Sequence, residues 1–376
     1  MIQDRPSQAL HFAGLNGLRT IAALMVMFGH ITRALDEFEL DRMVFGADPN
    51  GNPYGSIQGG ISVTIFFCLS GFLITSLLLE EKKNDISIKN FYIRRILRIW
   101  PLYFFYMGLV LLTMYYYNDR IVPSRLLWYI FIGANVPFIF GGSIMLLAHY
   151  WSLGVEEQFY AIWPWMVKKV GIRRMLLVFA IVFVVLFALK VYFRWINIQD
   201  NIARPFVFMN TIRFDVMILG GMGALLYFLR NAVFIRICTH LLAQVVAWGI
   251  LIMFLFNIHY GITFNHEIAA VCTLVVMIGQ IEKKNRIFNL DNRVMDFLGK
   301  ISFGIYVYHP LIIFFVARLL KGYDIAPAIK YPLVFGLVSV ATVLTAFLSY
   351  EYFEKKFLKL KERFTTVRSS PVSMRE

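Results

Sequence analysis

The stretch GLNGLRTIAALMVMFGHI, residues 14–31, carries Arg19 and His30 in an otherwise mostly apolar segment. The two positions are eleven residues apart, and eleven helical steps of about 100° return to within roughly 20° of the starting direction. Both side chains therefore lie on one stripe of a helix, about 16 Å apart along its axis. An ionisable residue inside a membrane helix is costly and usually faces protein or water. The pair predicts a polar site that extends across a bilayer.

The composition also indicates an integral membrane protein. Of the 376 residues, 59% are hydrophobic and only 16% are charged, whereas an ordinary soluble domain has about 25% charged residues. The net charge of +14 is explained by basic loops on one side of a membrane rather than by a nucleic-acid partner. The three cysteines have neither metal-type spacing nor the pattern of a disulfide framework, so no metal is predicted.

Apolar windows long enough to cross a bilayer predict an all-α bundle of about ten transmembrane helices. The shorter window 126–140 contains Asn135 and Pro137, and we expect 126–148 to be re-entrant or half-spanning. The ten windows are 17–33, 58–79, 100–118, 151–167, 175–194, 212–229, 241–258, 262–281, 301–320 and 331–350.

Loop charge sets the predicted orientation. With both termini cytoplasmic, the inner loops hold 25 Lys and Arg residues and the outer segments hold 11, as the positive-inside rule requires. The first apolar segment is long and lacks a cleavage site for a signal peptidase, so we expect it to be retained. No loop is long enough to form a separate domain. We therefore predict one membrane domain, 1–360, followed by a short cytoplasmic tail, 361–376.

The segment HYWSLGVEEQFYAIWPW, 149–165, places Glu156 in an aromatic, apolar span. The predicted topology puts Glu156 at a depth similar to that of His30, and a buried carboxylate is usually paired. A contact between the two would orient the imidazole and raise its basicity, so that it could act as a general base. Two plainer interpretations stay open. His30 is also consistent with an interfacial histidine bonded to a carbonyl, and Glu156 with an arginine pair that locks helices together.

The segment SIKNFYIRRILRIWPLY, 87–103, is predicted to lie at the cytoplasmic face. Arg95 and Arg98 are three residues apart on a helix, so they project to nearly the same side and suit a pair of phosphates. Contact with anionic lipid head groups explains them equally well. Arg19 likewise fits either a functional group or a side chain that anchors its helix at the inner interface.

Two further segments supply candidate substrate contacts. In LGKISFGIYVYHPLI, 298–312, Tyr306 and His309 share a helix face, although a lone buried histidine is more often a bonded core residue. In GGISVTIFFCLSGFLIT, 59–75, Ser70 stands among small residues. Such residues usually permit close helix packing, and the alternative is a close approach of substrate.

Together these segments, in this order, resemble the integral-membrane acyltransferases called acyltransferase family 3, from about 14 to 357. The closing SYEYFEKKF, 349–357, fits as well. The family's Arg-x10-His element matches Arg19 and His30, and its Arg-x-x-Arg element matches Arg95 and Arg98. Its Trp-Ser-Leu-x-x-Glu element matches the stretch that ends at Glu156. About twenty residues follow the last matched segment, so we expect no hydrolase-like extension.

The resemblance implies an O-acetyltransferase of a bacterial cytoplasmic (inner) membrane. Such an enzyme moves an acyl group, usually acetyl, from cytoplasmic acyl-CoA to a hydroxyl of a surface polysaccharide, lipopolysaccharide or lipo-oligosaccharide. We expect acetyl-CoA as co-substrate, a glycan or glycolipid as acceptor and membrane lipids as surroundings. A macrolide-type small molecule is the alternative acceptor. A transporter or flippase is the alternative function, although no inverted repeat supports it.

One mechanism unites these expectations. Arg95 and Arg98 would hold the CoA phosphates, and the thioester arm would follow the stripe marked by Arg19. His30, supported by Glu156, would remove the proton of the acceptor hydroxyl. The candidate oxyanion donors are Ser70, Tyr306 and His309.

Overall fold

The computed structural model describes residues 12–43, 46, 59–84, 86–118, 122–200, 203–256 and 264–365. Within these ranges every regular element is a helix and there is no strand, so the predicted all-α class is confirmed. The helices are α1 (Leu15–Arg33), η1 (Leu35–Phe38), α2 (Gly59–Glu81), η2 (Lys82–Asn84), α3 (Ile88–Tyr116), α4 (Pro123–Ile130), α5 (Asn135–Ile139), η3 (Met145–Tyr150), α6 (Trp151–Lys169), α7 (Ile172–Asp200), α8 (Ala203–Ile212), α9 (Phe214–Phe228), α10 (Ala232–Cys238), α11 (Leu241–Leu255), α12 (Asn265–Ile281), α13 (Arg293–Leu320), α14 (Pro327–Ser349), η4 (Tyr350–Glu354) and α15 (Lys355–Glu362).

By length and composition, six of the described helices could cross a membrane, or seven if the bent pair α10 and α11 forms one span. Three other predicted windows fall on α1 and α6, of 19 residues each, and on α12, of 17 residues. The polytopic helical bundle is therefore confirmed. The count of ten spans and the cytoplasmic position of both ends stay predictions.

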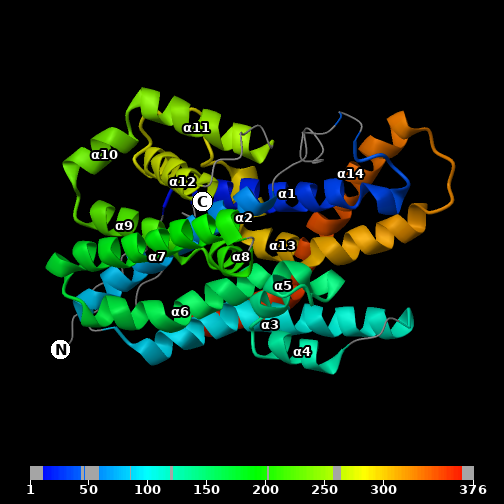
Figure 1. The fold of residues 1–376 in the computed structure, drawn as a ribbon, viewed down its shortest axis with the longest axis horizontal. Helices are drawn as coiled ribbons and strands as arrows, with labels where there is room; N and C mark the ends of the chain where they lie inside the picture. Colours follow the sequence, from blue (N-terminus) through cyan, green and yellow to red (C-terminus); the bar gives the residue numbers. More distant parts are fainter. Residues whose placement is uncertain are drawn as a thin grey trace.

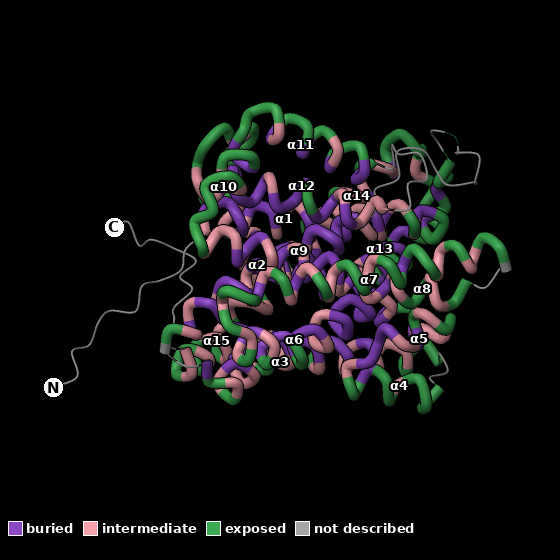
Figure 2. The backbone as a smooth tube through the Cα atoms, turned by 60° about the vertical axis from the view of Figure 1, so that its left-hand side comes forward, coloured by how far each residue is buried: buried purple, intermediate pink, exposed green. Residues whose placement is uncertain are grey.

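Helix α2 lies in the centre of the bundle. It is apolar on every side, as expected for a helix surrounded by other helices, and Figure 2 shows it buried beside α1 and α9. Glycines allow close contact with α9: a Cβ at Gly71 would lie 2.0 Å from the carbonyl oxygen of Met217, and one at Gly220 would lie 2.2 Å from that of Cys68. The packing interpretation of the small residues in this segment is thus confirmed for Gly71.

Helices α1 and α13 run side by side (Figure 1). Thr20 donates a hydrogen bond to the Met295 carbonyl at 3.0 Å, and Asn16 donates to Asp296 at 3.3 Å. A Cβ at Gly299 would lie 2.4 Å from the Asn16 carbonyl oxygen, so only glycine permits this approach. The contact places the far half of α1 against the far half of α13, where His30 and His309 lie.

Residues 126–148 form no single long helix. They are divided among α4, α5 and η3, and the backbone reverses at Ile132 and Gly141, both with positive φ. The segment is held to α6 by paired amides, since Asn135 and Gln158 exchange two hydrogen bonds of 3.1 and 2.8 Å. None of these pieces is long enough to cross a bilayer, and re-entry of the segment stays a prediction.

Candidate active site

Two histidines meet where α1 packs against α13. His30 Nδ1 lies 2.8 Å from His309 Nε2, and the ring centroids are 4.8 Å apart. His309 Nδ1 lies 3.2 Å from the Ile305 carbonyl oxygen, one turn earlier on α13. His309 is fully buried and His30 is half-buried. The partner of His30 is therefore His309, at a distance of 279 positions in the sequence.

A third histidine adjoins this pair. The ring of His149, which precedes α6, has its centroid 5.4 Å from that of His309, and the side chain is 3% exposed. The Tyr306 hydroxyl donates to the His149 carbonyl at 2.7 Å and lies 2.5 Å from Ser152 Oγ. We refer to His30, His149, His309, Tyr306 and Ser152 as the histidine cluster. No three His, Cys, Asp or Glu side chains of the described chain are arranged to hold a metal ion.

Glu156 does not pair with His30 as the sequence suggested. One of its oxygens, Oε1, accepts hydrogen bonds from the hydroxyls of Ser70 and Tyr160, and no bond joins Glu156 to His30 in the described part of the chain. The cause is local geometry: Tyr160 lies one helical turn away at i+4, and Ser70 faces it from α2. Both hydroxyls bond Oε1, and the imidazole of His30 bonds His309 instead, so the expected direct contact between Glu156 and His30 is absent from the described contacts.

Arg19 lies on the side of Glu156 rather than of His30. The charges of Arg98, Glu156 and Arg95 all act on its guanidinium. The hydrogen bond that it donates from Nη1 to Asn16 Oδ1 is long at 3.5 Å. The stripe predicted on α1 thus joins two different environments, one at each end.

Arg95 and Arg98 differ from their neighbour Arg94. Arg94 is 3% exposed and is bonded to Glu81 at 2.5 Å and to the Phe364 carbonyl at 2.8 Å. Arg95 and Arg98 are half-buried, and neither forms an ion pair with a described carboxylate. The Arg95 guanidinium lies 5.5 Å from the centroid of the Tyr160 ring, and its buried Nε has no hydrogen-bond partner. These two cations are available to an anionic ligand, whereas Arg94 serves the fold.

We refer to Arg19, Arg95, Arg98, Glu156 and Tyr160 as the arginine cluster. Helix α6 connects it to the histidine cluster, because α6 carries Ser152 in one and Glu156 in the other. One turn separates these two residues, a rise of about 6 Å. The fold therefore places a cationic region and an imidazole region in sequence along the interior of the bundle.

Sequence reasoning missed His149 as a member of the site. Its one signal was its position at the start of the segment 149–165, two residues before Trp151. Of the three residues predicted to contact substrate, Tyr306 and His309 lie in the histidine cluster and Ser70 lies beside Glu156. In this structure each one donates its proton to, or shares it with, a protein group.

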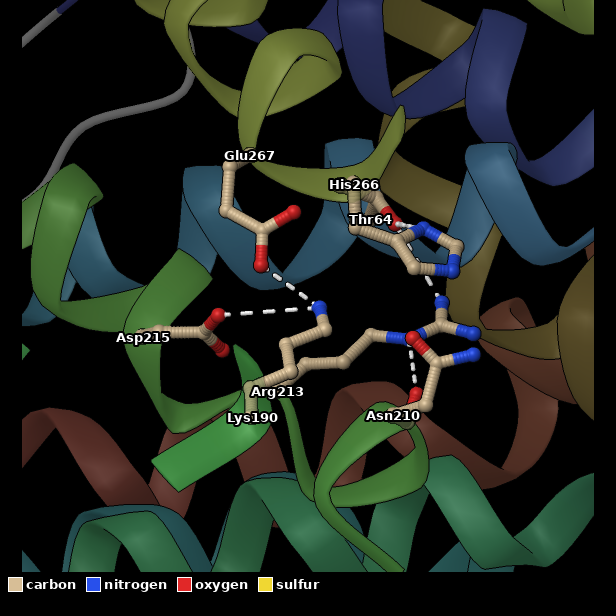
Figure 3. A network of polar contacts seen from close by, with 7 residues as sticks. All are labelled: Thr64, Lys190, Asn210, Arg213, Asp215, His266 and Glu267. Atoms are coloured by element: carbon tan, nitrogen blue, oxygen red, sulfur yellow. Dashed lines mark hydrogen bonds and ion pairs between the residues drawn. The ribbon is translucent and has the colours of Figure 1, made fainter. Parts of the chain in front are cut away.

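A second buried polar network, which the sequence did not predict, lies outside both clusters (Figure 3). Lys190 Nζ lies 2.5 Å from Glu267 Oε1 and 3.8 Å from Asp215 Oδ2. Arg213 donates to the Gly60 carbonyl at 2.7 Å and to Thr64 at 3.2 Å. The formal charges of the two cations and two carboxylates cancel. The network ties α2, α7, α9 and α12 together, and we assign it to the fold because removing one partner of a buried ion pair is strongly destabilising.

Comparison with known proteins agrees with the geometry. The sequence model of the acyltransferase domain family, acyltransferase family 3, matches residues 12–351. A protein of Staphylococcus aureus (strain COL), provisionally named an O-acetyltransferase, is 26% identical over 374 residues. That alignment covers 93% of this chain and 58% of the relative. The chain therefore spans somewhat more than half the length of this relative.

A protein of Bacillus subtilis (strain 168), provisionally named a peptidoglycan O-acetyltransferase, is 33% identical over 168 residues, covering 41% of this chain and 23% of its own length. No solved structure matches the chain. The motifs on which the resemblance rested are spread over nearly the whole chain, and the family match covers the same range. The protein belongs to acyltransferase family 3.

Proposed function

We propose that the protein is an O-acetyltransferase of a bacterial inner membrane, which moves an acetyl group from cytoplasmic acetyl-CoA to a hydroxyl of a surface glycan or glycolipid. The observation that carries the proposal is that the arginine cluster and the histidine cluster lie one after the other along the interior of the same bundle. Arg95 and Arg98 lack acidic partners among the described residues at one end, and His30 lies in the histidine cluster at the other. The name of the Bacillus subtilis relative favours a glycan acceptor over a macrolide-type molecule.

At the donor end, Arg95 and Arg98 bind the phosphates of CoA. Guanidinium groups suit phosphate because they are always charged and present several donors in one plane. Contact of Arg95 with the Tyr160 ring restrains its head group, so less side-chain entropy is lost when the ligand binds. The thioester arm then extends past Arg19 toward the histidine cluster.

At the acceptor end, His30 removes the proton of the attacking hydroxyl. The hydroxyl oxygen forms a bond to the acetyl carbonyl carbon, and the bond from that carbon to the CoA sulfur breaks. The CoA thiolate leaves with the electron pair of that bond and takes the proton from His30, which returns to its neutral form. General acid–base catalysis of this kind contributes about 10²- to 10⁴-fold, and fixed positions of the two substrates contribute further.

Glu156 has a different role from the one that the sequence suggested. It accepts the hydroxyls of Ser70 and Tyr160 and thereby holds the ring against which Arg95 lies. Its charge also acts on Arg19 and Arg98. Glu156 thus organises the arginine cluster and offsets part of its positive charge while no ligand is bound.

The test is direct transfer by the purified protein in a detergent or nanodisc. Acetyl-CoA labelled in the acetyl group is incubated with a glycan acceptor from a bacterial envelope, and released CoA thiol and labelled glycan are both measured. The proposal predicts release of one thiol for each acetyl group transferred. If the protein moved a solute across the membrane of reconstituted vesicles but released no CoA thiol, it would be a transporter and the proposal would be rejected. His240→Gln, an exposed substitution away from both clusters, is the control.

A further inference from the structure

The contacts of His309 settle which of its nitrogens carries the proton. Its Nδ1 lies 3.2 Å from the Ile305 carbonyl oxygen, and a carbonyl oxygen can only accept a hydrogen bond. The Nδ1 atom must therefore hold a hydrogen. A neutral imidazole has one N–H and one lone pair, which leaves His309 Nε2 as an acceptor.

The neutral form of His309 follows from its surroundings. The ring is fully buried, and no described carboxylate forms an ion pair with it or with His30. The titratable and charged groups that face the pair are His149, Tyr306 and Arg33. None of these is an acid that would compensate a second positive charge, and burial without compensation disfavours the charged form.

The acceptor nitrogen of His309 then determines the tautomer of His30. His309 Nε2 lies 2.8 Å from His30 Nδ1, so His30 must donate a hydrogen from Nδ1. The lone pair of His30 is then on Nε2, the nitrogen on the other side of the ring. We propose that His309 is the positioning residue of this enzyme: it holds His30 in the Nδ1–H tautomer and so makes His30 Nε2 the atom that receives the acceptor's proton. The inference rests on the proposed function.

This relay, from the Ile305 carbonyl through His309 to His30, does the orienting work that an aspartate does in a Ser-His-Asp triad. It differs in charge, because both the carbonyl and His309 are neutral. When His30 takes a proton, its Nδ1–H becomes a donor from a cation, and hydrogen bonds from ionised donors are about twice as strong as neutral ones. The hydrogen bond to His309 therefore strengthens as the reaction proceeds, and catalysis depends on interactions that behave in this way.

The same assignment removes His309 from the candidate oxyanion donors. Its single N–H is used by Ile305, and its other nitrogen accepts. A side chain with no hydrogen left to donate cannot stabilise a developing oxyanion.

Three substitutions separate an orienting role from a merely structural one. The amide oxygen of His309→Gln reaches about as far as Nε2 and can still accept from His30, whereas the shorter His309→Asn ends near the position of Nδ1. His309→Leu has no acceptor at all. We expect kcat for acetyl transfer to fall about 100-fold in the Asn and Leu variants, the low end of what a general base supplies. The kcat of the Gln variant should be at least about tenfold higher than that of the Asn and Leu variants. The KM for acetyl-CoA should stay unchanged in all three.

Nuclear magnetic resonance of protein labelled with nitrogen-15 in histidine reads the tautomer without any turnover. Loss of one resonance in His30→Gln protein identifies His30, and His240→Gln serves as control. The inference requires that wild-type His30 is protonated at Nδ1. It is overturned if wild-type His30 is protonated at Nε2, or if His309→Gln is no more active than His309→Leu. If wild type releases no CoA thiol, the proposed function fails, and the tautomer still decides the relay on its own.

Discussion

Removal of Arg95 and Arg98 should weaken acetyl-CoA binding by an amount that the structure allows us to work out. A hydrogen bond to a charged group contributes about 1.5 to 3 kcal/mol, and each 1.4 kcal/mol is a tenfold change in Kd. Both side chains are half-buried, so water screens them and the lower figure applies. We expect Arg95→Ala or Arg98→Ala to raise the Kd of acetyl-CoA about tenfold, and the double variant to raise it about 100-fold.

A ligand without phosphates tests whether the two arginines bind the phosphates of acetyl-CoA. S-acetylpantetheine has the thioester and the arm of acetyl-CoA but none of its phosphates. Its affinity should therefore be the same for wild type and the double variant, as measured by competition in a detergent-solubilised sample. Lys89→Ala is the matched control, because Lys89 is an exposed cation on the same helix, α3.

An unchanged Kd for acetyl-CoA in the double variant would show that Arg95 and Arg98 do not bind its phosphates. The arginines would then contact lipid head groups, as the sequence also allowed. An equal loss of affinity for acetyl-CoA and S-acetylpantetheine would also count against phosphate binding, because it would indicate a distorted site.

Three other predictions follow from single contacts. Glu156→Gln keeps an acceptor for the hydroxyls of Ser70 and Tyr160 but loses its charge. We therefore expect about a tenfold lower kcat/KM with a near-normal Tm. A kcat/KM equal to that of wild type would show that Glu156 has no part in the site. Gly71→Ala places a Cβ 2.0 Å from the Met217 carbonyl oxygen, and the overpacking should lower the free energy of unfolding by about 1 to 3 kcal/mol, seen as a lower Tm; an unchanged Tm would mean that α2 and α9 lie further apart. Lys190→Met leaves two buried carboxylates unpaired and should cost about 3 to 5 kcal/mol in denaturant unfolding; a stability equal to that of wild type would show that the ion pairs are absent.

The sequence predicted the fold class and the family of the chain better than its contacts. Windows of hydropathy, the spacing of Arg19 and His30 and the ordered motifs were sufficient to predict an all-helical bundle of acyltransferase family 3. Those features depend on local composition and period, which a linear sequence displays. The family match over residues 12–351 confirms that the ordered set was specific.

The partner of His30 could not be predicted in this way. Whether Glu156 or His309 faces the imidazole depends on how α1, α6 and α13 are rotated about their axes. That rotation is set by close contacts such as Gly299 against Asn16, and these join residues far apart in the sequence. The predicted topology gave an approximate depth for each group in the membrane but not the direction in which its side chain points from the helix. At that depth the sequence favoured Glu156 as the partner of His30. The packing of α1 on α13 instead places His309 beside it.

The buried network around Lys190 was missed for a related reason. The predicted window 175–194 contains Lys190, but the 11 outer cations include it, because the count by loop assigns a charge near the end of a window to the adjoining loop. In the structure it lies 1% exposed within α7, with Glu267 of α12 beside it. A cation near the end of a predicted span cannot be assigned to solvent or to the core until its neighbours in space are known.

We propose that His30 takes the proton of the acceptor hydroxyl as the oxygen of that hydroxyl attacks the acetyl carbonyl carbon of acetyl-CoA. The most direct measurement compares labelled acetyl transfer to an envelope glycan by wild type and His30→Ala, at matched amounts of folded protein and with the Kd of acetyl-CoA measured for both. We expect the rate of transfer by His30→Ala to fall by about 10²- to 10⁴-fold while the Kd of acetyl-CoA stays within about a factor of two. Transfer by His30→Ala at the wild-type rate would contradict it.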